Sequence, residues 1–194
     1  MSLGKVLITG ANSGLGVSLV KKFVNEGYEV FSHQGSNHFD LRKKDDIVNL
    51  CQEAKEWGVN ILVNNAAIVC PSIPFEEYSR EKIEDMVKVN LIAPIFLTQE
   101  LLPVLESVIN INSMVGLEVK SPRTLYSATK WGLRGFSNSL KSEKENLHIL
   151  DVYPTNIKTT PDKQNAMDVD VVVNKIYTAM KNGESDLVID GRPK

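Results

Sequence analysis

The chain has 194 residues, a length that suits one domain and is too short for a nucleotide-binding domain joined to a full substrate domain. Its 22 lysines and arginines are scattered among 24 aspartates and glutamates, for a net charge of -2. This balance argues against a nucleic-acid-binding face and a polybasic membrane anchor, and it favours small-molecule partners.

Cysteine and histidine usage argues against two further classes of protein. Cys51 and Cys70 form no disulfide framework, and the core-like run at residues 3–8 has no signal peptide or transmembrane run before it. We therefore expect a cytoplasmic protein. The three histidines form no compact ligand pattern with the cysteines, so we expect no metal site.

Apolar runs of strand length alternate with longer segments of helical periodicity. The predicted strands are Lys5–Thr9, Tyr28–Ser32, Ile61–Asn64, Ser107–Asn112, Ile149–Tyr153 and Leu187–Ile189. The predicted helices lie near residues 14–27, 43–57, 80–106, 124–145 and 168–182. This alternation predicts a parallel sheet with helical crossovers, in a single α/β domain over residues 1–194.

The first predicted strand runs into the sequence TGANSGLG, which places Gly10, Gly14 and Gly16 between a strand and a helix. Because glycines have no side chain, the backbone N–H groups at this junction can approach an anion at the positive end of the helix. A dinucleotide phosphate is the first candidate for this anion. The spacing differs from G-x-G-x-x-G and from the phosphate loop that ends in Gly-Lys-Ser/Thr. By itself the segment could also be a tight strand-to-helix connection.

The interval between Ser32 and Phe39 is too short for a helical crossover to a further parallel strand. The second crossover helix is therefore missing or vestigial. The FDL sequence at residues 39–41 is either a short edge strand or a loop beneath a bound dinucleotide.

The predicted helix 80–106 contains Asn90 and, four residues later, a proline. Pro94 has no N–H, so the helical hydrogen bond to the Asn90 carbonyl cannot form. We expect either a kink that serves packing or a carbonyl that holds a water molecule.

Three further side chains form a pattern with chemical meaning. Ser113 follows a buried strand, at the edge where open parallel sheets bind ligands, and the sequence YSATK places Tyr126 and Lys130 one helical turn apart on the same face. A phenol with an ordinary pKa near ~10 is a poor base at neutral pH, and a neighbouring ammonium would lower that pKa. Each residue also has a plain structural explanation: a serine at a strand end, a half-buried tyrosine and a solvated lysine.

In chain order, TGANSGLG, FDL, NNAA, Asn90, Ser113, YSATK and YPTNIKTT resemble the motifs of the short-chain dehydrogenase/reductase family. The resemblance implies a Rossmann-type doubly wound parallel sheet in three α/β/α layers. It also implies an NAD(P)(H)-dependent oxidoreductase that transfers hydride between the nicotinamide and a carbonyl or secondary alcohol. Four catalytic residues follow by resemblance: Tyr126 as general acid/base, Ser113 holding the substrate oxygen, Lys130 binding ribose and lowering the tyrosine pKa, and Asn90 positioning a water.

The same resemblance implies which residues bind the cofactor. They are Gly10, Asn12, Ser13, Gly14, Leu15 and Gly16 in the phosphate turn, Ser32 and His33 beside the adenosine ribose, Asp40 and Leu41 at the adenine, Asn64 and Ala66 on the ribose side, Tyr126 and Lys130 at the catalytic centre, and Ile157 and Thr159 at the carboxamide. The end of the second strand offers no carboxylate to repel a phosphate and no arginine to grip one. We therefore expect NADP(H) to bind somewhat better than NAD(H). Arg42 and Lys43 are near enough to contribute, although they could equally be a solvated helix start.

Three departures from the family pattern bear on the site. Ala67 replaces a frequent glycine, Thr155 replaces the glycine after Pro154 and narrows the site, and the chain is short after the second strand and over residues 160–167. The short segments leave little room for a helical lid, so we expect an open pocket.

Other points stay open at this stage. The chain could instead be a non-catalytic dinucleotide-binding redox sensor or interaction module. Broad apolar faces on the helices with Asn90 and Tyr126 predict a homodimer or homotetramer. For a carbonyl or alcohol substrate, apolar contacts from Ile68, Val69, Val115 and Leu117 and an acid-binding role for Lys120 and Arg123 are both open.

Overall fold

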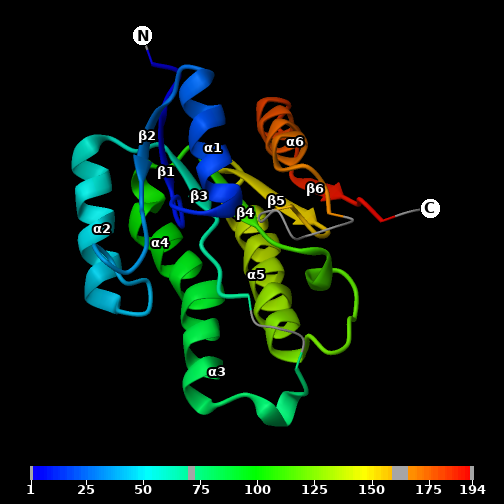
Figure 1. Cartoon of the computed structure of the whole chain (residues 1–194). Helices are drawn as coiled ribbons and strands as arrows, with labels where there is room; N and C mark the ends of the chain where they lie inside the picture. Colours follow the sequence, from blue (N-terminus) through cyan, green and yellow to red (C-terminus); the bar gives the residue numbers. More distant parts are fainter. Residues whose placement is uncertain (1, 70–72, 159–165, 193–194) are drawn as a thin grey trace.

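A six-stranded parallel sheet forms the centre of the computed structural model of this chain, which describes residues 2–69, 73–158 and 166–192 (Figure 1). The strands are β1 (Lys5–Ile8), β2 (Glu29–Ser32), β3 (Ile61–Asn64), β4 (Ser107–Ile111), β5 (His148–Pro154) and β6 (Asp186–Ile189). They lie in the order β2-β1-β3-β4-β5-β6. Each predicted strand is found, and the four central strands are almost entirely buried, as is typical of strands that read as continuous apolar runs.

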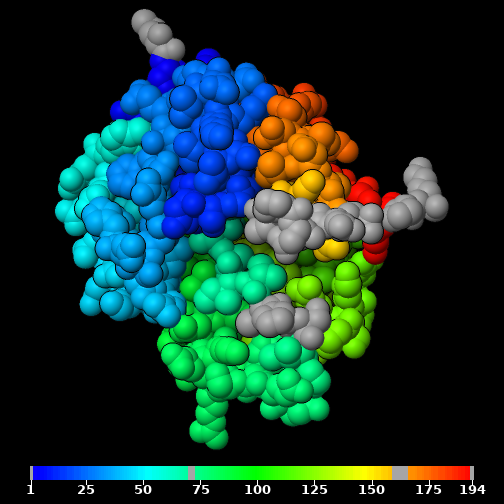
Figure 2. Space-filling view, in the orientation of Figure 1, coloured from blue at the N-terminus to red at the C-terminus, as the bar shows by residue number. Residues whose placement is uncertain are grey.

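Helices cover both faces of this sheet. α1 (Gly14–Asn25) and α6 (Val169–Lys181) lie on one face, and α2 (Lys44–Trp57), α4 (Ala93–Leu101) and α5 (Thr124–Glu143) lie on the other. Alternate residues of a strand serve the two faces: Val6 and Ile8 pack toward α1, whereas Leu7 packs toward α2 and α4. Figure 2 shows α6 (orange) beside α1 (blue) on the outside of the first face. The predicted three-layer, doubly wound α/β fold is confirmed.

The chain reverses its direction across the sheet at β1. The crossover through α1 leads outward to β2, and α2 then brings the chain back to β3 on the other side of β1. In open sheets of this kind, ligands bind at the carboxyl ends of the strands beside such a reversal. The fold therefore places the glycine turn after β1 at the expected binding edge.

The FDL segment is a loop and not an edge strand. Phe39 and Leu41 are nearly buried and pack with Leu50 of α2 in the core on that face of the sheet. The expected loss of a crossover helix after Ser32 agrees with the structure, in which α2 makes the whole connection from β2 to β3.

The single helix predicted over residues 80–106 is interrupted. It consists of α3 (Arg80–Val87), a π-helical turn (Lys88–Ile92), α4 and a 3₁₀ turn (Leu102–Val104). The N–H of Ala93 donates to the carbonyl of Lys88, five residues earlier, and the next residue, Pro94, has no N–H to donate. A kink was expected at this position. The helix instead has a widened π-helical turn around Asn90, and Pro94 follows this turn.

One helical stretch of the described chain, Arg80–Val104, is long and apolar enough to cross a membrane by length and composition, with a mean hydropathy of 1.3. Core helices of globular proteins share these properties. Here Met86, Leu97 and Leu101 are fully buried in the fold, while 33 % of the most apolar window is buried. Much of this apolar stretch therefore remains partly exposed.

Candidate active site

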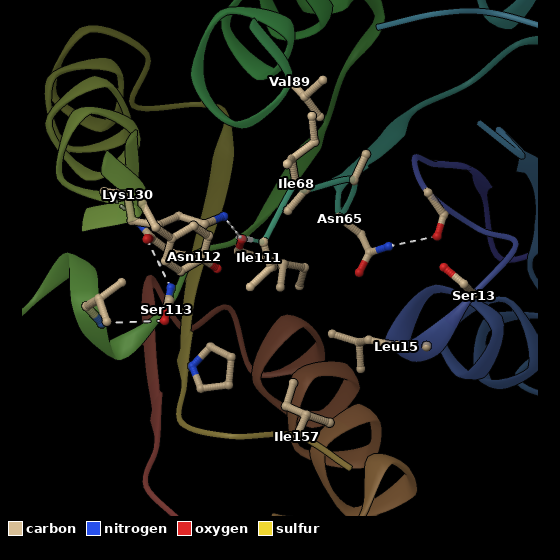
Figure 3. Close-up of a pocket in the computed structure, with 18 of the residues that line it drawn as sticks. Ser13, Leu15, Asn65, Ile68, Val89, Ile111, Asn112, Ser113, Lys130 and Ile157 are labelled. Atoms are coloured by element: carbon tan, nitrogen blue, oxygen red, sulfur yellow. Dashed lines mark hydrogen bonds between the residues drawn. The ribbon is translucent and has the colours of Figure 1, made fainter. Parts of the chain in front are cut away.

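A cavity of about 1170 Å³ lies across the carboxyl ends of the central strands. One end is lined by the glycine turn and the start of α1, and the other by the end of β4 and the start of α5. Figure 3 shows Ser13 and Leu15 facing Ser113 and Lys130 across this space. The structure therefore brings the predicted cofactor turn and most of the predicted catalytic group to one cavity.

The predicted site residues divide into two groups by position. Those that line the cavity are Gly10, Asn12, Ser13, Gly14, Leu15, His33, Asp40, Leu41, Ala66, Ser113, Tyr126, Lys130 and Ile157. Gly16, Ser32, Asn64 and Asn90 are described but are not among its lining residues, and Thr159 lies outside the described residues.

The glycine turn has a backbone geometry that glycine adopts easily. Gly10 and Gly14 have φ of 64° and 51°, and a Cβ on Gly10 would lie 2.9 Å from Cα of Ala66. α1 begins at Gly14, its first turn holds no acidic residue, and the Ser13 side chain makes no cap hydrogen bond. Backbone N–H groups at this end can therefore donate to an anion, which the helix dipole also favours. The turn fits the phosphates of a dinucleotide.

Asn65 holds this turn against the end of β3. Its Nδ2 donates to the carbonyls of Thr9 (2.8 Å) and Gly10 (3.1 Å), and Thr9 Oγ1 accepts from the N–H groups of Asn65 and Ala66, each at 3.0 Å. Gly16 completes the arrangement, because a Cβ there would overlap the Gly10 carbonyl oxygen. Asn65 was not among the predicted site residues, although the NNAA motif contains it.

The structure corrects the prediction for Asn64, whose side chain points away from the cavity. It is 3 % exposed, and its Nδ2 donates to Asn110 Oδ1 at 2.9 Å on the α5 side of the sheet. Asn110 in turn donates to Ser137 of α5. Because side chains alternate across a strand, the next asparagine faces the turn and Asn64 does not.

His33 lines the cavity, and its buried side chain supports the glycine turn. Its Nδ1 lies 3.3 Å from the Gly10 nitrogen and its Nε2 lies 2.7 Å from the Phe39 carbonyl oxygen. Since a carbonyl can only accept, Nε2 carries the proton and Nδ1 accepts from Gly10. Burial lowers the pKa of His33, which favours this neutral form. Ser32, its neighbour, is not among the cavity-lining residues.

Arg42 is an exposed residue just before α2 that lines the cavity and is ion-paired with two carboxylates. Its guanidinium holds Asp40 through Nε (2.9 Å) and Nη2 (2.8 Å), and its Nη1 lies 2.9 Å from Asp85 of α3. Hydrogen bonds from Arg42 keep the pKa of Asp40 below its usual value. Two carboxylates therefore already engage this arginine.

Ser113, Tyr126 and Lys130 meet at the other end. Ser113 follows β4 in an extended conformation, and α5 carries Tyr126 in its first turn and Lys130 one turn later. Lys130 Nζ donates to the Ile111 carbonyl at 2.8 Å and lies 5.6 Å from the centroid of the Tyr126 ring. Asn112, a residue missed from sequence, links β4 to α5 by donating to the Lys130 carbonyl.

The pKa values at this end differ from the expectation. Burial raises the pKa of Tyr126, and this effect is opposed by a hydrogen bond with Ser113 and by the charge of Arg123. Burial lowers the pKa of Lys130 to about 8. In the protein alone, the phenol pKa is therefore raised and not lowered as predicted, because desolvation outweighs the hydrogen bond and the charge that oppose it.

Asn90 does not line the cavity itself, but its side chain makes hydrogen bonds that hold a residue of the cavity wall. Its Oδ1 accepts from the Ile68 N–H at 2.7 Å and its Nδ2 donates to the Ile68 carbonyl at 2.9 Å. The same Nδ2 lies 3.4 Å from Thr129 Oγ1 on α5. This side chain thus fixes the segment after β3 beside Lys130, while the water-holding role of its carbonyl stays a prediction.

Thr155, the departure after Pro154, ties the end of β5 to the C-terminal segment. Its Oγ1 accepts from the Gly191 N–H at 2.9 Å and lies 3.4 Å from the Ile189 carbonyl. Thr155 and Ile157 line the cavity, as does Arg192 next to Gly191. Sequence motifs gave no signal that the end of the chain would reach the site.

The chain was compared with known protein families and structures. The family model of short-chain dehydrogenases matches residues 35–170. Among curated relatives, the mitochondrial D-beta-hydroxybutyrate dehydrogenase of Bos taurus is 31 % identical over 175 residues, covering 74 % of this chain and 51 % of the relative. An NADP-dependent 3-hydroxy acid dehydrogenase of Shigella flexneri is 29 % identical, with coverage of 79 % and 70 %. The chain spans about half the length of the bovine relative.

Solved structures share the fold. A short-chain dehydrogenase from Streptomyces avermitilis superposes with a TM-score of 0.86 at 22 % identity, covering 97 % of this chain and 89 % of that one. A metagenomic blue fluorescent protein in complex with NADPH reaches 0.88 at 18 % identity, with coverage of 98 % and 97 %. The family match, the order of the motifs along the sequence and the site geometry agree. The chain belongs to the short-chain dehydrogenase family.

Proposed function

We propose that this protein is an NAD(P)(H)-dependent oxidoreductase that transfers hydride between the nicotinamide and a carbonyl or secondary alcohol. The proposal rests on one observation, a cavity with an anion-accepting glycine turn at one end and Ser113, Tyr126 and Lys130 at the other. The dehydrogenase names of the curated relatives support it.

Each residue of the catalytic end has a distinct task in this proposal. The bound nicotinamide supplies or accepts the hydride. Ser113 holds the substrate oxygen, and the Tyr126 phenol exchanges a proton with that oxygen. Because burial raises the pKa of Tyr126, the phenol is protonated at neutral pH and is ready to donate in the direction of carbonyl reduction. Lys130 binds the cofactor ribose, and backbone N–H groups at Gly14 and Leu15 hold the phosphates.

Substitution of Tyr126 tests the proposal. Tyr126→Phe keeps the ring and removes the proton donor, so turnover of a carbonyl panel should fall on the order of 10² to 10⁴, with NADPH affinity little changed. Lys130→Met should reduce both turnover and NADPH affinity. Tyr177→Phe, on α6 and away from the cavity, is the matched control and should behave as wild type.

One outcome favours the redox-sensor alternative. A wild-type protein that binds NADPH but reduces no carbonyl compound, with Tyr126→Phe identical to it in binding and partner assays, would remove the support for catalysis. A non-catalytic dinucleotide-binding module would then be the better explanation.

For the cofactor, we propose a modest preference for NADP(H). The end of β2 carries no carboxylate to repel the extra phosphate, and Asp40 is already held by Arg42. Because Arg42 is also ion-paired with Asp85, it binds the extra phosphate of NADP(H) only weakly in this proposal. Calorimetric titration should give a lower Kd for NADPH than for NADH, and tenfold tighter NADH would contradict this.

For the assembly, we propose a homodimer or homotetramer formed through the face of α4 and α5. The partly exposed apolar stretch Arg80–Val104 supports this, as does Trp131 on α5, which is 45 % exposed. Light scattering that finds only a 21.6 kDa species at micromolar concentration would contradict it.

A further inference from the structure

The segment Asp190–Arg192, directly after β6, reaches the end of the cavity that holds Ser113. Arg192 lines the cavity together with Glu118, which lies two residues after the 3₁₀ turn Met114–Gly116 that follows Ser113. These two residues are 74 positions apart in the chain, and Arg192 Nη1 donates to Glu118 Oε1 at 2.6 Å. This pair, the Glu118–Arg192 bridge, joins the segment after β6 to the segment after β4 on one side of the molecule (Figure 2).

Thr155 and Met167 fix the position of the segment after β6. Thr155 Oγ1 accepts from the Gly191 N–H at 2.9 Å, and the Thr155 N–H donates to the Ile189 carbonyl at 3.0 Å. Met167 packs so closely beside Gly191 that an added Cβ would overlap its Cγ atom. The glycine that Thr155 replaces in the family pattern has no hydroxyl and could not make the first of these bonds. The backbone before Arg192 is therefore held from two sides.

A second carboxylate orients the Arg192 guanidinium toward Glu118. Nε and Nη2 of Arg192 donate to the Asp190 carboxylate at 2.9 and 2.7 Å, which leaves Nη1 to face Glu118. Such a two-point contact fixes the plane of a guanidinium as well as its position. A single ion pair whose side chains are 49 % and 37 % exposed contributes little, whereas several charges that form a network on a held backbone contribute more. The bridge is therefore a defined part of the cavity wall.

Glu118 is also held at a set position relative to Ser113. The Glu118 N–H donates to the Met114 carbonyl at 3.0 Å, which closes the turn after Ser113. Gly116 in this turn leaves no room for a side chain, because an added Cβ would lie 2.7 Å from Asn112 Oδ1. Backbone and packing thus fix the distance along the wall from Ser113 to the bridge. A substrate whose oxygen is bound at Ser113 has limited space in the direction of the bridge.

We infer that Glu118 and Arg192 are specificity-determining residues, whose bridge limits the size of the group that a substrate can carry on that side of its carbonyl or hydroxyl carbon. The inference rests on the proposed oxidoreductase function and adds a size limit to it. A small group fits with the bridge closed, whereas a large group has to part the two side chains. Because the pair is exposed, added salt should weaken the bridge and with it the size limit.

A thiol placed at position 113 measures this limit without any turnover. In Ser113→Cys combined with Cys70→Ser, the remaining native cysteine is Cys51, which is buried, and burial raises its thiol pKa to about 12, so it does not react at pH 7. Methyl and benzyl methanethiosulfonate both modify an accessible thiol, and each rate is divided by the rate for free cysteine. The corrected methyl rate should exceed the corrected benzyl rate by roughly tenfold or more.

Removal of the bridge should abolish this difference. Arg192→Gln and Glu118→Gln should each bring the ratio of corrected rates close to one, and the double variant should add nothing, because both changes remove the same interaction. Lys55→Gln is the control, since it removes an exposed ion pair with Glu100 between α2 and α4 and should leave the ratio unchanged. A ratio near one with the bridge intact, or a ratio that Arg192→Gln leaves unchanged, overturns the inference.

A pair of ketones repeats the test in the chain that keeps Ser113, and it separates the inference from the proposed function. With NADPH, Arg192→Gln should raise kcat/KM for 4-phenyl-2-butanone roughly tenfold relative to 2-butanone, and Lys55→Gln should not. An unchanged ratio in Arg192→Gln overturns the inference. If wild type reduces neither ketone, the oxidoreductase proposal loses its support, and the labelling rates decide the size limit on their own.

Discussion

Gly16 sits where α1 passes the glycine turn, and adding one methyl group there should disturb both folding and cofactor binding. A Cβ would lie 2.9 Å from the Gly10 carbonyl carbon and from Asn65 Nδ2, and would overlap the Gly10 oxygen. Neither partner can retreat easily, because Leu19 and Phe23 anchor α1 in the core and Asn65 holds Gly10. Overpacking of this kind costs about 1–3 kcal/mol, offset by up to about 1 kcal/mol of better helix propensity.

Overlap with a backbone oxygen puts the packing cost at the upper end of this range, so the expected net loss for Gly16→Ala is about 2 kcal/mol, which for a chain of this size lowers Tm by roughly 4–8 °C. NADPH affinity should fall with it, because the N–H groups of the turn are displaced. Gly135→Ala is the control: it lies inside α5, and an added Cβ meets no described atom within 4 Å. That variant should gain up to about 1 kcal/mol. Thermal melts and calorimetry that show Gly16→Ala as stable and as tight-binding as wild type would refute the packing argument.

Two further predictions concern buried titratable groups. Burial lowers the pKa of His33, so the unfolded chain binds the proton first and stability should fall as pH drops below about 6.5, by at most about 1.4 kcal/mol per pH unit. His33→Asn should give a flatter profile of Tm between pH 7 and 5, and an identical slope would contradict this. Lys141 Nζ lies 2.9 Å from Oδ2 of the fully buried Asp151, whose pKa burial raises. Lys141→Met should cost about 3–5 kcal/mol in urea unfolding at pH 8. It should cost less at lower pH, because burial raises the pKa of Asp151 and protonation of this carboxyl removes the unpaired charge, and a loss that does not change with pH would refute the reasoning.

The sequence was sufficient to predict the architecture and the two ends of the site. Uninterrupted apolar runs and amphipathic segments are local properties, and their alternation determines a parallel sheet with crossover helices. The position of Ser113 after a buried strand, and the spacing of Tyr126 and Lys130 on one helix, likewise depend only on local geometry. These predictions needed no knowledge of which strands become neighbours.

The roles of adjacent polar residues needed the tertiary structure. Whether Asn64 or Asn65 faces the glycine turn depends on the phase of side-chain alternation at the strand end, which is set by pairing with β1 and β4. His33 became a support of Gly10 because the FDL segment folds back over it, a contact between loops that no local pattern predicts.

The charged residues show most clearly which features follow from the sequence alone and which need the tertiary structure. The sequence by itself determined that Arg42, Lys120, Arg123 and Arg192 exist, and it determined the helix on which Tyr126 lies. Only the tertiary structure decided that Arg42 is ion-paired with two carboxylates, and that Arg192 lines the same cavity as Lys120 and Arg123. The physical reason is that a charge acts through its distance to other groups, and those distances are set by segments far apart in the chain.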